Sequence, residues 1–472
     1  MEQLEILKNT FIKGLVGERP YAKEELERIM EEAVITIKSN PDCSFKELTN
    51  LMILDTKREF EKVASHEYLV PVPGITVGLN ANNSNIKFIS GNLNSQNKEL
   101  TKESLFDIAS MTKLYTAVIS YNLIKDGYYT LETKVRDICP NFENIGDLTI
   151  DDLMKFNASF KTNGRVDDAK TQEEAKERFY TLEVKSKNYE YNDFHTMILK
   201  EIFERVTGLT YEQLLNKYII EPLKLKNTYL NIPETKKENI TGTANREIIM
   251  PNDPKSVILG SGGHAGIFAN NDDTITFSKN LLANSILLDS KFVHNLTLAN
   301  NCIDMKGNIV LNRGVFGSTY VNHTEGLDKT FLDKTFFPSG FAYQGSTRTQ
   351  GMGFRYDVED KIISGAATIL QNPASTDFEL AKQVQDELNK KRSLEGKAPI
   401  QITKEYSFID ENGKEINAKL VDGRTFIPIG TLDSLNKAIS KSLLKLSFLD
   451  YVSSNYEPNY QETIDEEIKI IK

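Results

Sequence analysis

The sequence has few of the side chains on which disulfide-stapled and metal-dependent proteins rely. Its 472 residues include five histidines, three cysteines and no tryptophan. The cysteines, Cys43, Cys139 and Cys302, are far apart and odd in number, so neither a disulfide framework nor a zinc site follows from them. No two histidines form a His-x-x-x-His pair, and we therefore expect no catalytic metal and no cofactor.

Positive charge and long apolar runs are also scarce. The formal net charge is −10, which argues against a nucleic-acid partner because phosphate binding needs a basic surface. No apolar run is long enough to span a bilayer, and the N-terminus alternates charged with apolar residues, without the apolar core of a signal peptide. We therefore expect no transmembrane segment. As written, the protein is expected in the cytoplasm, or outside the cell if a leader has been removed.

Length and composition allow two domains, or one large domain with additions at its ends. Hydrophobic residues make up 39% of the chain and charged residues 26%, as in ordinary globular proteins. The composition changes near residue 393, where Lys and Glu become frequent. We expect an N-terminal helical extension at 1–68, a central domain at 69–392 and a C-terminal accessory module at 393–472, the two additions having no partner that the sequence identifies.

The order of the expected elements suggests a mixed fold. Strands come first in the central domain, helices follow, and strands and a helix return at its end. This order predicts an α/β or α+β fold in which both ends build one antiparallel sheet beside a helical lobe, with a cleft between them. The segments are helices at 21–33 and 45–52, a strand pair at 74–80 and 86–91, helices between 110 and 230, strand residues at 353–370, a helix at 378–392 and a hairpin at 402–421.

The segment from Phe106 to Ala117 carries the most specific chemical signal. It places Ser110 and Lys113 one helical turn apart, where a polar segment gives way to an apolar rhythm that predicts a helix with one buried stripe. A serine in the first turn of a helix lies near unsatisfied N–H groups, and a lysine on the same face can exchange a proton with its hydroxyl. This pattern predicts an activated nucleophile that needs no histidine.

The spacing alone is weak evidence. Ser-x-x-Lys also occurs at Ser84, Ser95, Ser434 and Ser442. The context of Ser110, Phe-Asp-Ile-Ala-Ser-Met-Thr-Lys followed by Thr-Ala, resembles the active-site segment of the serine β-lactamase-related hydrolases. That family includes class C β-lactamases, low-molecular-weight penicillin-binding proteins, D-aminopeptidases and esterases. The resemblance covers roughly residues 70–390 and implies a β-lactamase/transpeptidase-like fold for the central domain.

A second segment resembles the family's tyrosine motif. Tyr191-Asn-Asp193 precedes a helix whose end, Glu-Arg-Val-Thr-Gly-Leu-Thr-Tyr, is similar to the family. The resemblance places Tyr191 at the position of the catalytic tyrosine, as a phenolate base or a proton relay. Asp193 stands at the asparagine position and is expected to hydrogen-bond Lys113. The alternative is that Tyr191 is only a packed aromatic residue at a helix start.

Two further segments are less specific. The glycine-rich stretch from Gly260 to Gly266 resembles one that supports the cleft in relatives, so His264 is expected to be structural rather than reactive. Relatives carry Lys-Thr-Gly or His-x-Gly on the strand beside the site, whereas here Tyr343 takes the place of the cation and Gly345 is retained. The N–H of Ser346 would then form the oxyanion hole with that of Ser110. Arg348 lies near enough in sequence to replace the missing cation.

Together these features predict a metal-independent serine hydrolase that acts through an acyl-enzyme. Its expected substrate is a small ester or amide, with a D-amino-acid or cell-wall-peptide character. The loss of Lys or His at position 343 favours an ester over a substrate that carries a free carboxylate. The alternative is a protein of the same fold that has lost turnover and serves as a binding or regulatory module.

Overall fold

The computed structural model describes most of the chain. The described residues are 2–16, 23–64, 74–93, 98–241, 251–281, 287, 300–303, 309–312, 341–344, 350–358, 361–371, 386, 389–390, 392–399, 401–404, 407–409, 415–417, 419–421, 424–426, 432–456 and 464–470. Among them, no helix is long and apolar enough to cross a membrane.

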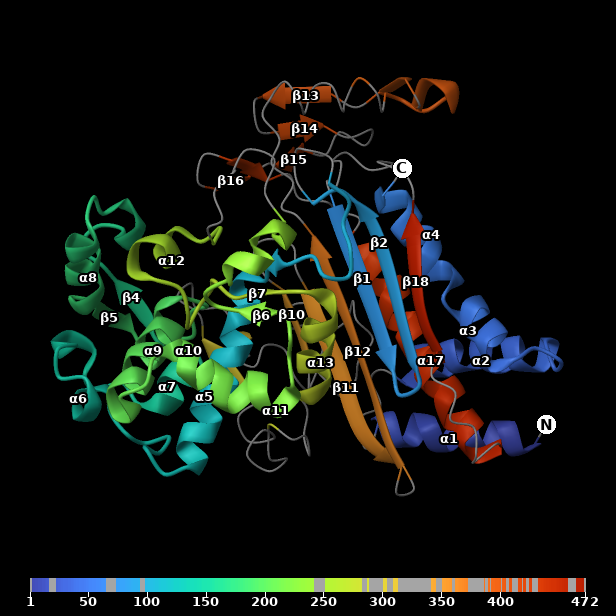
Figure 1. The fold of residues 1–472 in the computed structure, drawn as a ribbon, viewed down its shortest axis with the longest axis horizontal. Helices are drawn as coiled ribbons and strands as arrows, with labels where there is room; N and C mark the ends of the chain where they lie inside the picture. Colours follow the sequence, from blue (N-terminus) through green and yellow to red (C-terminus); the bar gives the residue numbers. More distant parts are fainter. Residues whose placement is uncertain are drawn as a thin grey trace.

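A six-stranded sheet forms the centre of the fold (Figure 1), with the strand order β10, β11, β12, β1, β2 and β18. The expected strand pair is confirmed, because β1 and β2 form an antiparallel hairpin. The strand expected at 353–370 is instead two antiparallel strands, β11 and β12. The last strand departs from the expected antiparallel sheet, because β18 pairs with β2 in parallel. The bounds are β1 (Gly74–Ala81), β2 (Ser84–Gly91), β10 (Phe341–Gln344), β11 (Gln350–Val358), β12 (Lys361–Gln371) and β18 (Ile464–Ile470).

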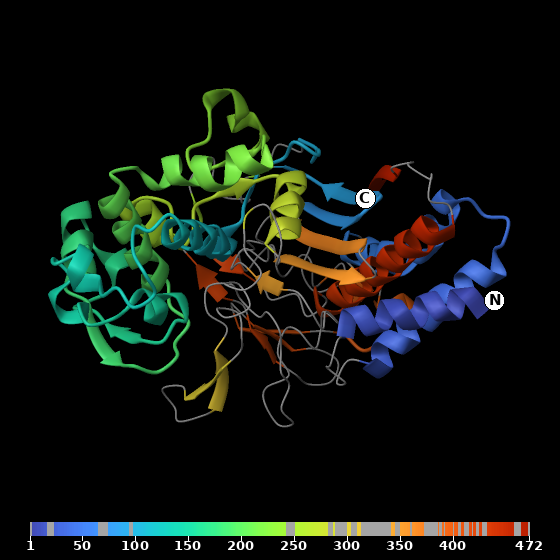
Figure 2. The ribbon, with the colours of Figure 1, turned by 90° about the horizontal axis from the view of Figure 1, so that it is seen from below.

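Helices from both ends of the chain cover one face of this sheet (Figures 1 and 2). They are α1 (Glu2–Val16), α2 (Lys23–Ser39), α3 (Phe45–Met52), α4 (Leu54–Ala64) and α17 (Leu432–Tyr456). The N-terminal helices expected from the sequence are thus confirmed. The Phe11 ring packs edge-on against Phe448 at 5.3 Å, and Thr56 Oγ1 donates to the carbonyl of Ala438 at 3.0 Å. Helix α17 therefore joins the first four helices in one layer.

Helix α13 (Asn271–Asn280) covers the opposite face of the sheet. The Asn271 amide donates to Thr76 Oγ1 at 3.1 Å, and a Cβ added to Gly78 would collide with Asn271 and Ile275. Thr76 and Gly78 lie two residues apart in β1, so they share this face, while their neighbours point to the helical layer. The central strand β1 is therefore buried on both sides.

A helical lobe lies beside the sheet (Figure 1). Its elements include α5 (Thr112–Lys125), α7 (Ile150–Met154), α8 (Gln172–Tyr180), α9 (Phe194–Thr207), α10 (Tyr211–Leu215), the π-helical turn η4 (Asn216–Ile220) and α12 (Pro254–Leu259). Helix α5 lies at the centre of the lobe, in contact with α9 and η4. It is buried on nearly all sides from Thr112 to Leu123, so the single buried stripe expected from the sequence was wrong. The sequence favours a single stripe because polar residues separate the apolar ones. In the structure, polar side chains such as Thr116 and Ser120 are buried as well and hydrogen-bond inside the lobe.

The part of the expected C-terminal module that precedes α17 contains short strands, whereas α17 and β18, which belong to the same expected module, pack on and extend the central sheet. Strands β13, β14 and β15 form a three-stranded sheet, and β16 pairs with β17. The expected hairpin corresponds to the antiparallel pair of β14 and β15, whose connection lies outside the described residues, as does most of the helix expected at 378–392. The division into three units stays a prediction. The bounds are β13 (Gln401–Lys404), β14 (Ser407–Ile409), β15 (Glu415–Asn417), β16 (Lys419–Val421) and β17 (Arg424–Phe426).

Candidate active site

Ser110 lies on a tight turn that leads from strand β3 (Phe106–Asp107) into helix α5. The preceding residue, Ala109, has a φ of 47°, in the left-handed region that non-glycine residues rarely occupy. The buried Asp107 carboxylate holds this turn, because it accepts from the N–H of Ala109 at 2.8 Å and from the N–H of Asn252 at 2.7 Å. Ser110 is half-buried between two buried neighbours, so the turn presents its hydroxyl while the backbone stays fixed.

Lys113 is fully buried and its ammonium group meets three oxygen atoms. Nζ donates to Ser110 Oγ at 3.0 Å and to the carbonyl of His264 at 3.2 Å, and it lies 2.8 Å from Asp193 Oδ1. An ammonium group has three N–H donors, so these acceptors match its charged form. Burial alone would lower the pKa of Lys113, but the charge of Asp193 and the contact with Tyr191 outweigh burial and raise it. Lys113 is therefore held as a cation against the serine hydroxyl.

Asp193 forms the ion pair with Lys113 that the sequence analysis expected. It begins α9, yet its side chain does not cap the helix, and Asn192 Oδ1 accepts from the N–H of Phe194 at 2.8 Å instead. This leaves the Asp193 carboxylate for two cations, since Oδ1 pairs with Lys113 and Oδ2 lies 3.1 Å from Lys255 Nζ. Burial alone would raise the pKa of Asp193, but Lys113 and the other nearby cationic groups lower it well below the usual range of a carboxyl. Asp193 is an anion at neutral pH.

Tyr191 lies at the open side of this group and is 48% exposed. The Lys113 ammonium is 5.0 Å from the centroid of its ring, a distance typical of a cation–π contact. On another side the ring meets Phe156 edge-on, at a centroid distance of 5.4 Å. The structure therefore brings Ser110, Lys113 and Tyr191 together, as the sequence analysis expected.

The glycine-rich loop closes the site behind Lys113. Gly262, Gly263 and Gly266 have φ values of 109°, 77° and 102°, which side chains other than glycine rarely adopt. A Cβ at Gly263 would lie 2.6 Å from the carbonyl oxygen of Thr196, so only glycine lets the loop approach α9 this closely. The loop thereby delivers the His264 carbonyl to Lys113, which is the supporting role expected of it.

Two charged residues of the site were missed by the sequence analysis, Asp253 and Lys255. Asp253 caps α12, where its Oδ1 accepts from the N–H of Ser256 at 2.8 Å and lies 2.7 Å from Nε2 of the buried His264. Lys255 follows in the first turn of α12 and reaches Asp193. The available signal was the Asp-Pro pair that commonly opens a helix. That signal predicts a helix start and says nothing of which distant residues meet there.

Only part of the strand motif expected beside the site, the part with Tyr343, lies within the described residues. Tyr343 lies in the edge strand β10, where it pairs with Gly351 of β11. Strand β10 lies beside the Ser110 turn, and a Cβ at Gly351 would lie 2.5 Å from the Met111 side chain. This edge of the sheet therefore borders the candidate nucleophile. Gly345, Ser346 and Arg348 lie outside the described residues.

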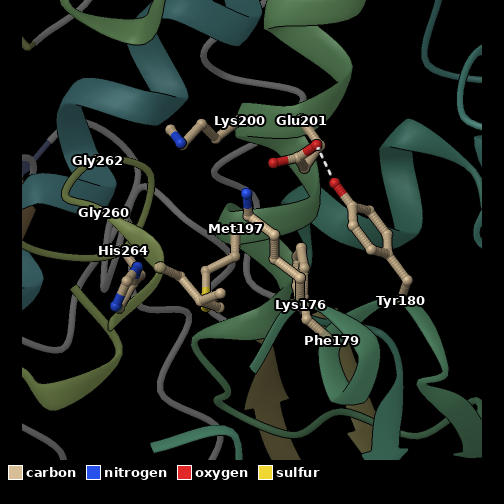
Figure 3. A pocket seen from close by; sticks show the side chains of 10 residues that line it. Lys176, Phe179, Tyr180, Met197, Lys200, Glu201, Gly260, Gly262 and His264 are labelled. Atoms are coloured by element: carbon tan, nitrogen blue, oxygen red, sulfur yellow. Dashed lines mark hydrogen bonds between the residues drawn. The ribbon is translucent and has the colours of Figure 1, made fainter. Parts of the chain in front are cut away.

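A small pocket lies between the glycine-rich loop and helices α8 and α9 (Figure 3). Met197, Lys200 and His264 are among the residues that line it, and Tyr180 donates to Glu201 at 2.8 Å at its edge. Ser110, Lys113 and Tyr191 are not among its lining residues. In the part of the chain that the structure describes, no group of three His, Cys, Asp or Glu side chains could hold a metal ion.

Among solved structures, the chain is similar to a class C beta-lactamase from Rhodobacter sphaeroides, at 15% identity and a TM-score of 0.49, over 72% of this chain and 99% of the other. A second class C beta-lactamase is 14% identical with the same TM-score, over 72% of this chain and 95% of the other. No curated protein sequence matches the chain.

The family assignment rests on a sequence model rather than on these distant structures. The model of the family described as Beta-lactamase matches residues 69–385, well over half of the chain. The same residues contain the turn with Ser110 and Lys113, the segment with Tyr191 and the sheet edge beside them. The chain therefore belongs to the beta-lactamase family, and this membership implies serine hydrolase activity.

Proposed function

We propose that the protein is a serine hydrolase in which Ser110 attacks a carbonyl and forms an acyl-enzyme. The observation that carries this proposal is the hydrogen bond of 3.0 Å from the buried Lys113 ammonium to Ser110 Oγ. A fixed cation beside a hydroxyl stabilises the negative charge that develops on its oxygen, and it does so most strongly where water is excluded. Lys113 is fully buried, so it meets that condition.

Tyr191 is the proposed proton carrier. Lys113 is held charged, so it cannot accept the serine proton in this state, whereas the exposed phenol of Tyr191 borders both Lys113 and the open side of the site. In the proposed sequence, Tyr191 enters as the phenolate, which the Lys113 charge stabilises. Ser110 Oγ forms a bond to the carbonyl carbon, the carbonyl oxygen takes the electron pair of the broken π bond, and the serine proton passes to the phenolate oxygen. The tetrahedral intermediate then expels the leaving group, which takes that proton. Water repeats both steps on the acyl-enzyme and releases Ser110.

The proposed oxyanion hole consists of the N–H groups of Ser110 and Ser346. Its support is the position of β10, which borders the Ser110 turn and ends at Gln344, shortly before Gly345 and Ser346 in the chain. Backbone donors serve this role without any particular side chain. The proposal therefore survives the replacement of the family's cation by Tyr343.

The proposed substrate is a small ester or amide of D-amino-acid or cell-wall-peptide character, with an ester preferred. Tyr343 provides no charge for a substrate carboxylate. The two lysines described at the site, Lys113 and Lys255, are both paired with Asp193. A substrate without a free carboxylate needs no further cation.

The first test is intact-mass analysis after incubation with a fluorophosphonate and, separately, with a fluorescent penicillin. We expect a fluorophosphonate adduct on the wild-type protein and none on Ser110→Ala. Ser442→Ala is the control, because Ser442 belongs to another Ser-x-x-Lys spacing but is buried against α4, where its hydroxyl lies 2.6 Å from that of Thr56. The absence of any adduct on the wild-type protein would contradict the proposal and favour the binding or regulatory alternative.

A further inference from the structure

The carboxylate of Asp193 is shared by two lysines that come from different parts of the chain. Lys113 reaches Oδ1 from α5, and Lys255 reaches Oδ2 from α12. The Lys255 side chain is 20% exposed and that of Asp193 23%, so this is not a pair of solvated surface charges. Ion pairs of limited exposure constrain geometry far more than surface pairs do.

The segment that carries Lys255 is itself tied to Lys113. Asp253 caps α12 and contacts the His264 ring at 2.7 Å, and the His264 carbonyl accepts from Lys113 at 3.2 Å. Lys255, two residues after the cap, therefore stands on a helix start whose position is fixed relative to Lys113. It has little freedom to leave Asp193.

The charge of Asp193 explains why a second lysine is needed. The family resemblance places an asparagine at this position, and a neutral amide can accept from Lys113 through one oxygen. A carboxylate has two charged oxygens, and with Lys113 as its only partner it would draw the ammonium toward both. That movement would compete with the hydrogen bond from Lys113 to Ser110.

We propose that Lys255 is a positioning residue for the reaction, because it occupies Oδ2 of Asp193 and so leaves the Lys113 ammonium directed at Ser110. This inference rests on the proposed function, since it concerns the activation of the same serine. The inference also adds to the proposed function, because it predicts that Lys255 is needed only while residue 193 carries a carboxylate.

The test compares the rate of fluorophosphonate labelling of Ser110 among variants. We expect Lys255→Gln to lower the rate on the order of tenfold, within the coupling seen among residues of one ion-pair network. Lys255→Arg, which keeps the charge, should retain most of the rate. Lys87→Gln is the matched control, because Lys87 is also largely buried and pairs with Asp272 at 2.8 Å, away from the site. It should label at the wild-type rate.

The decisive comparison uses Asp193→Asn. On that background Lys255→Gln should not lower the labelling rate further, so the double variant should label at the rate of Asp193→Asn alone. The inference is overturned if Lys255→Gln labels at the wild-type rate, if Lys87→Gln loses as much, or if the losses of the two single variants multiply in the double variant. If Lys255→Gln does not fold, the double variant still tests the inference. A labelling rate of the double variant well below that of Asp193→Asn would overturn it.

A crystal structure of Lys255→Gln separates this inference from the proposed function. If the wild-type protein forms no adduct, the proposed function fails, but the position of Lys113 can still be measured. We expect the Asp193 carboxylate to turn toward Lys113 and the distance from Nζ to Ser110 Oγ to exceed hydrogen-bonding range. Unchanged distances among Ser110, Lys113 and Asp193 would overturn the inference.

Discussion

Lys113 Nζ and Asp193 Oδ1 lie 2.8 Å apart in an ion pair whose lysine is fully buried and whose carboxylate faces a second cation. The lysine comes from the first turn of α5 and the carboxylate from the residue that begins α9. This pair holds a positive charge beside Ser110, and the proposed chemistry depends on that charge.

Removal of the Asp193 carboxylate should destabilise the protein. In Asp193→Ala the buried ammonium of Lys113 loses its anionic partner, and breaking such a pair costs about 3 kcal/mol of the free energy of unfolding at pH 7. Asp193→Asn should cost less, because its amide oxygen can still accept from Lys113. Urea unfolding of the three proteins measures the difference.

The pH dependence of this effect has a definite sign. The pKa of Asp193 is lowered in the folded state, so its contribution is present above about pH 4, the unfolded value, and is lost as the pH falls below it. The pKa of Lys113 is raised, so its contribution is lost only above about pH 10. The gap between the unfolding free energies of wild type and Asp193→Ala should therefore be present at neutral pH and shrink below pH 4. An equal gap at pH 3 and pH 7 would contradict this account.

Phe156 is expected to hold Tyr191 in place. Its backbone has a φ of 53°, its ring is buried, and it contacts both Tyr191 and His195 edge-on. Phe160 is a matched control, since it contacts His195 at 4.8 Å but is not paired with Tyr191. Phe156→Leu should slow fluorophosphonate labelling several-fold, because an aromatic pair contributes about 1 kcal/mol beyond its buried area. Phe160→Leu, at a less buried position, should lose less stability and label at close to the wild-type rate, and equal slowing of both variants would refute the role of Phe156.

Gly263→Ala should destabilise the protein more than Gly208→Ala. Both glycines have a positive φ, 77° and 68°, so alanine at either position costs about 1 kcal/mol in backbone energy. At Gly208 nothing lies near the added Cβ, whereas at Gly263 it would meet the carbonyl oxygen of Thr196 at 2.6 Å. We expect a further loss of about 2 kcal/mol at Gly263, since no flexible side chain can move away. Thermal unfolding of the two variants tests this difference, and similar losses would show that the loop can shift.

The buried His195 should cause the free energy of unfolding to fall in mild acid. Burial lowers the pKa of this histidine to about 4, against contacts that would raise it. Between about pH 6.5 and pH 4 the unfolded chain then binds a proton that the folded protein does not, which amounts to about 3 kcal/mol of lost stability. In His195→Gln this part of the pH dependence of the free energy of unfolding should be absent. Asp450, whose pKa burial raises to about 6, acts in the opposite direction, so wild type and variant must be compared at each pH.

Much of the fold, and the two site residues Ser110 and Lys113, could be predicted from local patterns. The hairpin of β1 and β2 follows from two strands joined by an Asn/Ser-rich turn, and the N-terminal helices follow from their apolar spacing, as in α2 with Leu26, Ile29, Met30 and Ala33 buried. Ser110 and Lys113 are three residues apart on one turn, so their meeting needs only a helix.

The partners of these elements could not be predicted in the same way. An apolar stripe on α1 or α17 shows that a face is buried, but not that the two ends of the chain pack together against one side of the sheet. The alternating pattern of β18 likewise does not reveal that it joins β2 in parallel, because the period of a strand is the same for every partner.

The sequence by itself determined the family, the helix that carries Ser110 and Lys113, and the tyrosine segment that faces them. Only the tertiary structure decided that Asp193 is shared by Lys113 and Lys255, and that the His264 carbonyl completes the lysine's set of acceptors. These contacts join three helices and the glycine-rich loop, which are distant from one another in the chain. Short-range periodicity carries no information about such pairs, whereas the packing of α5, α9 and α12 fixes the distances among them.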